Sequence, residues 1–115
     1  MDRQTRKRLH DAIEAAEEIL DITKGPTFQD FVGNLVLKKA VYYDFAVLGE
    51  ALRQYDKYAP EDTPPLSASR AASDMRNQLI HGYATVDPGV VWSTIEQDLP
   101  NLLDELNILL DDRTL

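Results

Sequence analysis

Apolar residues recur at a helical spacing along almost the whole chain, and this periodicity is the feature that most constrains the fold. Four stripes have the spacing of three or four residues that marks one face of an α-helix. They are Leu9, Ile13, Ala16, Leu20; Leu37, Val41, Phe45, Leu48, Leu52, Tyr55; Ala68, Ala72, Met75, Leu79; and Val91, Ile95, Leu99, Leu102, Leu106, Leu109. No segment alternates with the period of two that is typical of a strand. We therefore predict an all-α protein, most simply an antiparallel four-helix bundle.

Helix-ending and helix-capping residues divide the first half of the chain. Gly25 followed by Pro26 is a stop signal for a helix that begins at Arg3. Thr27 and Asp30 then resemble a capping arrangement for a short helical turn. After that turn, the second stripe belongs to a longer helix, which an asparagine at position 34 can cap.

The second half of the chain carries similar signals. Residues 59–66 hold three prolines and no periodicity, so they are expected to form a connection. Gly82 is expected to end the third helix, and Asp87 followed by Pro88 to start the last one. Pro100 lies inside the last stripe, where it removes a backbone hydrogen bond. The sequence therefore predicts a kinked C-terminal helix.

Composition limits the class of function. The 115 residues, 43% hydrophobic and 28% charged, are the size and composition of one globular domain, so residues 1–115 are treated as a single domain. A net charge of −8 means that any polyanionic ligand must be met by a local basic site. The lack of cysteine excludes thiol chemistry, and two histidines are too few for an imidazole-rich metal site, whereas a carboxylate site stays open; no cofactor is expected. No apolar segment reaches membrane-spanning length, and we expect a soluble, cytoplasmic protein.

A polar cluster at the predicted end of the third helix is the clearest candidate site. It contains Arg76, Asn77, His81 and Tyr83 within eight residues. Imidazole can pass a proton in either direction near neutral pH, and guanidinium holds phosphate oxygens through a fixed fork. In RNA the 2′-hydroxyl group can itself be the nucleophile, so such a pair suits cleavage of a phosphodiester without a metal. The same groups could instead bind the last carbonyls of the helix, and spacing alone leaves both interpretations open.

Two further features have structural interpretations. The basic run from Arg3 to Arg8 could contact phosphates but is more typical of a solvated helix start. Four tyrosines in the second helix could stack on bases, but their positions on a periodic helix favour packing. These are Tyr42, Tyr43, Tyr55 and Tyr58.

The polar cluster also carries a family resemblance. Arg76, His81 and Tyr83 fit an Arg-x4-His-x-Tyr pattern, and the segment MRNQLIHGYATVDPGVVWSTIEQDLPNLLDEL resembles the HepT-like branch of the HEPN superfamily. Gly49 and Glu50, followed by alanine, resemble the signature of its second helix. The resemblance covers nearly the whole chain. It implies a HEPN-like helical bundle that works as a homodimer and as a metal-independent endoribonuclease toxin of a type VII toxin–antitoxin pair.

The resemblance also implies roles for single residues. Arg76 and His81 would be the catalytic pair, with Asn77 as a polar helper, and Tyr83 would be modified with AMP by an MntA-like nucleotidyltransferase antitoxin. Residues 41–46, VYYDFA, lack the Arg-Asn stretch that family members often show. This departure is compatible with a divergent toxin or with a member that binds without cutting. The alternative is therefore a noncatalytic helical subunit that binds substrate for, or partners, a nucleotidyltransferase.

Overall fold

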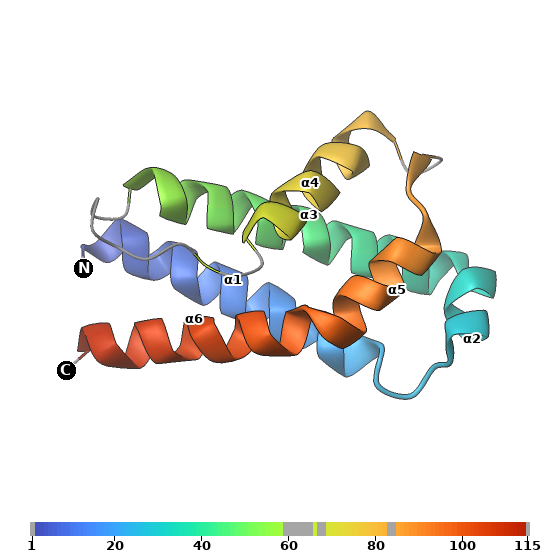
Figure 1. The fold of residues 1–115 in the computed structure, drawn as a ribbon, viewed down its shortest axis with the longest axis horizontal. Helices are drawn as coiled ribbons and strands as arrows, with labels where there is room; N and C mark the ends of the chain where they lie inside the picture. The colour runs from blue at the N-terminus through green and yellow to red at the C-terminus, as the bar shows by residue number, and fades with distance from the viewer. Residues whose placement is uncertain (1, 59–65, 67–68, 83–84, 115) are drawn as a thin grey trace.

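The computed structural model describes residues 2–58, 66, 69–82 and 85–114. The described part of the chain is helical and holds no strand (Figure 1). In chain order the helices are α1 (Arg3–Ile22), α2 (Phe28–Gly33), α3 (Leu35–Tyr58), α4 (Ser69–His81), α5 (Pro88–Gln97) and α6 (Leu99–Thr114). The predicted all-α class is confirmed. None of these described helices is both long enough and apolar enough to cross a membrane.

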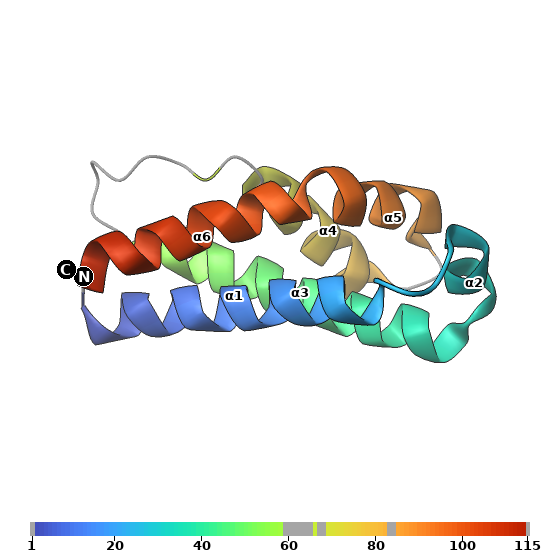
Figure 2. The same ribbon diagram turned by 90° about the horizontal axis from the view of Figure 1, so that it is seen from below.

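Three long helices form the body of the protein. In Figure 1 α1 lies between α3 and α6, and both views show that each of these two runs in the opposite direction to α1 (Figures 1 and 2). The shorter α4 packs on α3 and crosses it at a steep angle (Figure 1). The described ends of the chain lie at the same end of the molecule. The fold is therefore a helical bundle in which α4 is inclined to the other helices.

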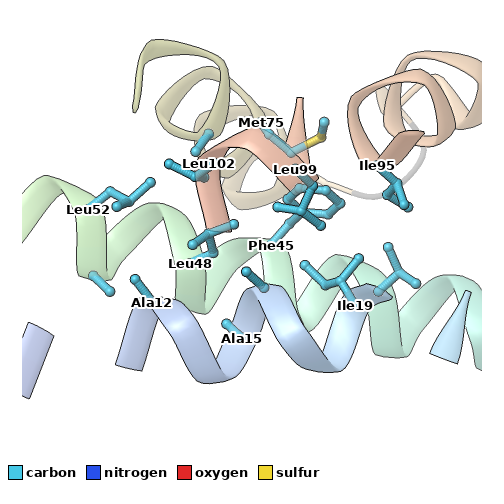
Figure 3. Close-up of a cluster of buried hydrophobic side chains, with 14 of the residues drawn as sticks. Ala12, Ala15, Ile19, Phe45, Leu48, Leu52, Met75, Ile95, Leu99 and Leu102 are labelled. Carbon is cyan, nitrogen blue, oxygen red and sulfur yellow. The ribbon is translucent and has the colours of Figure 1, made fainter. Parts of the chain in front are cut away.

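The predicted stripes form the hydrophobic core, apart from Ala68, which lies outside the described residues. Side chains from α1, α3, α4, α5 and α6 converge between the helices in Figure 3. The labelled side chains are Ala12, Ala15, Ile19, Phe45, Leu48, Leu52, Met75, Ile95, Leu99 and Leu102. Met75 of α4 takes part in this core, so burial of apolar surface holds α4 against α3. The next residue, Arg76, is only partly buried and lies at the edge of the contact between α3 and α4.

The predicted capping residues bind the helix ends that the sequence assigned to them. Thr27 and Asp30 form a reciprocal capping box, with hydrogen bonds of 3.0 and 3.1 Å. Asn34 accepts a hydrogen bond of 3.0 Å from the backbone N–H of the third residue after it. Asp87 accepts one of 2.8 Å from the backbone N–H of Gly89. These side chains satisfy backbone donors that the first turn of a helix leaves unpaired.

The predicted kink in the C-terminal helix is present as a break at Asp98, where α5 ends and α6 begins (Figure 1). Pro100 has no N–H to donate to the carbonyl four residues earlier, so the regular hydrogen-bonding pattern is interrupted there. The bend brings α5 against α2, where the rings of Trp92 and Phe31 lie 5.2 Å apart.

One carboxyl group is buried between α1 and α3. The Asp44 side chain on α3 is 5% exposed, and its Oδ2 atom has no hydrogen-bond partner among the described residues. Burial, together with a hydrogen bond to Glu18 of α1 and the charge of Glu18, raises the pKa of Asp44 to about 7. The folded protein therefore holds a proton at Asp44 over a pH range in which an unfolded chain would release it.

This proton predicts a loss of stability as the pH rises. Between about pH 4 and pH 7 the folded state binds more protons than the unfolded state, so the free energy of unfolding should decrease with increasing pH. Asp44→Asn keeps a neutral side chain at every pH and should reduce this decrease by on the order of 1 kcal/mol. Urea unfolding at pH 5 and pH 8 measures the difference. Asp104→Asn, which changes an exposed residue, should behave as the wild type does. An unchanged pH dependence in Asp44→Asn would show that this proton is not held.

Candidate active site

A glycine allows α3 and α4 to approach closely at the candidate site. A Cβ atom added to Gly49 would lie 2.7 Å from the Cβ of Arg76 and 2.9 Å from the carbonyl oxygen of Ala72. Real Cβ atoms essentially never show such short contacts. A glycine inside a helix is unfavourable by about 1 kcal/mol relative to alanine, so its presence here has a packing reason. Because Gly49 has no side chain, the Cβ atom of Arg76 packs directly against the backbone of α3.

The Arg76 side chain is held by an ion pair with the residue that follows this glycine. Its Nε atom lies 2.9 Å from Oε2 of Glu50, and the side chain is 24% exposed. Glu50 also accepts hydrogen bonds of 3.0 Å from Arg53 and from Gln54. On the other side, Nη1 of Arg76 donates a long hydrogen bond of 3.4 Å to Oδ1 of Asn77. The structure thus brings together Arg76 and Asn77 and adds Glu50.

The Glu50 carboxylate keeps its charge over the physiological pH range. Hydrogen bonds from Arg53 and Gln54, with the positive charges of Arg76 and Arg53, lower the pKa of Glu50 to about 2. Guanidinium carries five N–H donors, and the contacts with Glu50 and Asn77 leave others available. Arg76 is therefore oriented by an anion while it can still donate to a phosphate.

Arg76 lines an open groove of about 430 Å³ between three helices. The lining residues are Arg76 and Ile80 of α4, Ala46, Val47, Glu50 and Ala51 of α3, and Arg8 and Asp11 of α1. Across the described residues, no three His, Asp or Glu side chains are grouped so that they could hold a metal ion. The groove combines two guanidinium groups, two carboxylates that are paired with cations, and apolar walls, so its guanidinium groups can bind an anion attached to an organic group.

His81 lies outside this groove. It is the last residue of α4 and is exposed, and Gly82 ends the helix with a φ of 130° that favours glycine. Five residues of α-helix correspond to about 7.5 Å along the axis and about 140° around it, so His81 and Arg76 leave α4 on different faces. Within one copy of the chain the predicted pair does not form one cluster. Tyr83, the predicted modification site, lies outside the described residues.

Comparison with protein families gives this arrangement a context. The family model described as "Ribonuclease HepT-like" matches residues 12–109, which include Glu50, Arg76 and His81. The chain belongs to the HepT-like family. The resemblance found in the sequence is thereby confirmed at the level of the family.

Curated relatives match this chain over most of their own length. "Probable ribonuclease HepT" of Thermococcus cleftensis is 34% identical over 105 residues, which cover 89% of this chain and 92% of the relative. "Putative RNase MJ1216" of Methanocaldococcus jannaschii is 32% identical over 104 residues, which cover 90% and 85%. "Putative RNase TTE0752" of Caldanaerobacter subterraneus is 30% identical over 105 residues, which cover 91% and 93%. No solved structure gives a significant match.

Two residues at the candidate site, Glu50 and Arg8, were not among the predicted site residues. Glu50 was recognised only as part of a family signature, although the glycine before it in a helix interior was a signal of close helix contact. For the basic run that contains Arg8 the sequence favoured a solvated helix start over phosphate contact, and in the structure Arg8 lines the groove with Arg76. No sequence signal could have placed it there, because its position depends on how α1 packs against α3.

The tight contact at Gly49 predicts a large effect of a small substitution. Gly49→Ala must push α4 away from α3 and should lower the free energy of unfolding by about 1–3 kcal/mol. Gly33→Ala is the matched control, because a Cβ at Gly33 would have no atom within 4 Å. Urea unfolding of the two variants at neutral pH compares them. Equal stability of both variants would contradict the close approach of the helices.

Proposed function

We propose that the chain is a metal-independent endoribonuclease toxin that acts in the cytoplasm and cleaves RNA with Arg76 and His81. Membership of the HepT-like family and the ribonuclease names of its relatives support this activity. The observation that carries the proposal is the Arg76 guanidinium, which Glu50 orients at 2.9 Å in an open groove. In a chain with a net charge of −8, this local cation is a suitable anchor for a phosphate.

The proposed chemistry uses a nucleophile that RNA itself supplies. The 2′-hydroxyl oxygen attacks the adjacent phosphorus, and the bond from phosphorus to the 5′-oxygen of the next nucleotide breaks. His81 acts as general acid or base for the proton of the attacking or leaving oxygen. Arg76 stabilises the additional negative charge on the phosphate oxygens in the transition state, and Asn77 helps to orient the guanidinium.

A homodimer completes this site. Because Arg76 and His81 leave α4 on different faces, one copy alone separates the proton-transfer group from the phosphate-binding group. A two-fold arrangement with the two α4 helices facing each other would place His81 of one copy beside Arg76 of the other. The exposed Ile80, between these positions on α4, offers apolar surface for the contact.

The proposed regulator is an MntA-like nucleotidyltransferase antitoxin that transfers AMP to Tyr83. An AMP group two residues after His81 would bring a bulky anion next to the catalytic pair. Its negative charge would repel the RNA backbone, and its size would block the approach of the scissile phosphate.

A second candidate function is a noncatalytic subunit that docks onto a nucleotidyltransferase. It is favoured by exposed apolar side chains around the junction of α2 and α3, where Leu35 and Val36 are 61% and 79% exposed. Phe28 and Val32 add to this surface. Exposed apolar surface of this kind is typical of protein interfaces.

Cleavage of single-stranded RNA in EDTA tests the first proposal. The wild type should cut, and His81→Ala should lower the cleavage rate by about 100-fold or more, because a general acid or base contributes at least that factor. Arg76→Lys keeps the charge but loses the planar fork, and it should also lower the rate. His10→Ala, which changes the other histidine at an exposed position, should cut as the wild type does.

The two candidate functions differ in the result they predict. A protein that binds the nucleotidyltransferase but cuts no RNA would support the noncatalytic subunit and exclude the nuclease. Wild-type rates in both His81→Ala and Arg76→Lys would disprove the assignment of the catalytic pair. Thermal unfolding of each variant shows whether a lost rate reflects a lost fold.

A further inference from the structure

Arg8 is a cation beside the candidate site. It is half-buried on α1 and lines the same groove as Arg76. Among the described residues, no ion pair or hydrogen bond involves its side chain. The neighbouring Lys7 differs, because it pairs with Asp11 at 3.0 Å. A half-buried guanidinium without an anionic partner is a ready binding group for a ligand that supplies one.

Arg8 also lines a second groove, of about 310 Å³, which lies between the start of α1 and the end of α3. Gln54 and Tyr58 form the α3 side of this groove. The sequence favoured packing for Tyr58, but its side chain is 55% exposed. The ammonium group of Lys57 lies 5.2 Å from the centre of the Tyr58 ring and adds a positive charge at this end. The groove therefore offers an aromatic ring, an amide and the Arg8 guanidinium, with the Lys57 ammonium group beside the ring.

The acidic residues of the two grooves have partners of their own. Asp2 accepts a hydrogen bond of 2.7 Å from the backbone of Thr5, as the N-cap of α1. Asp11 is paired with a lysine, and Glu50 with two arginines. Cations compensate the negative charges of Asp11 and Glu50, and the N-terminus of α1 stabilises that of Asp2, whereas no described residue supplies an anion to Arg8. The two grooves are thus suited to an anion although the chain as a whole is acidic.

We propose that the two grooves form one binding track for single-stranded RNA, with Arg8 binding a backbone phosphate next to the one at Arg76 and Tyr58 stacking on a base. Single-stranded nucleic acids are bound in this way, by cations that follow the backbone and by aromatic rings that stack on bases. The inference rests on the proposed nuclease function and extends it. It adds a substrate subsite built from α1 and α3, away from the catalytic helix.

The test compares Arg8→Gln and Tyr58→Leu with Arg3→Gln as the matched control. Arg3 is exposed on the same helix and lines neither groove. Each change is made in the wild type, for kcat and KM, and in His81→Ala, for binding of a fluorescent single-stranded RNA. Thermal unfolding of each variant checks the fold.

Arg8→Gln should raise KM and weaken binding about 5-fold or more with little change in kcat, because it loses one charged phosphate contact. The slope of log affinity against log salt should decrease by about 0.7 for that contact. Tyr58→Leu should weaken binding about 5-fold or more through lost stacking. Arg3→Gln should stay within about twofold of its parent, since it is screened by solvent.

The outcomes separate this inference from the proposed function. If the wild type cleaves RNA and Arg8→Gln and Tyr58→Leu keep its KM and affinity, the track is wrong and the nuclease stands. If the wild type binds RNA through Arg8 and Tyr58 but does not cleave it, the nuclease is wrong and the track stands. If it neither binds nor cleaves RNA, both are wrong. An equal loss in Arg3→Gln would indicate only general electrostatic attraction and would also overturn the track.

Discussion

The close contact between α3 and α4 at Gly49 is the constraint on which the candidate site depends. It brings the backbone of α4 against α3, so that the Arg76 guanidinium meets the Glu50 carboxylate at 2.9 Å. Arg53 and Gln54 hold Glu50 from the same helix and keep it ionised. The ion pair thereby restricts the flexible Arg76 side chain to one direction, toward the open groove. Because the side chain is already ordered, it loses less conformational entropy when it binds an anion.

The distribution of charge explains how an acidic chain could handle a polyanion. The acids near the groove are capped, paired or hydrogen-bonded, so they add little repulsion there. The cations Arg8 and Arg76 come from helices far apart in sequence and meet only because α1 and α4 both pack on α3. Net charge thus describes solubility, while the local arrangement of side chains determines which ligand can bind.

Much of the fold could be predicted because it depends on local patterns. The stripes became the core, Thr27 and Asp30 formed their capping box, and the effect of Pro100 appeared as the break at Asp98. The steep crossing of α4 over α3 could not be predicted, because it depends on tertiary contacts. Asp44 also escaped prediction, since an acidic residue beside an apolar stripe is expected to face solvent and here does not.

The sequence predicted which residues belong to the candidate site better than it predicted how they are arranged. Arg76 and Asn77 are in contact, but Arg76 and His81 leave α4 on different faces. The proposed active site therefore needs His81 from a second copy of the chain. End-group analysis of RNA fragments produced by the wild type tests most directly whether the RNA 2′-hydroxyl is the nucleophile. Attack by the 2′-hydroxyl oxygen should leave fragments with 2′,3′-cyclic phosphate and 5′-hydroxyl ends. Fragments with 3′-hydroxyl and 5′-phosphate ends would show that water attacked instead, and would contradict the proposed mechanism.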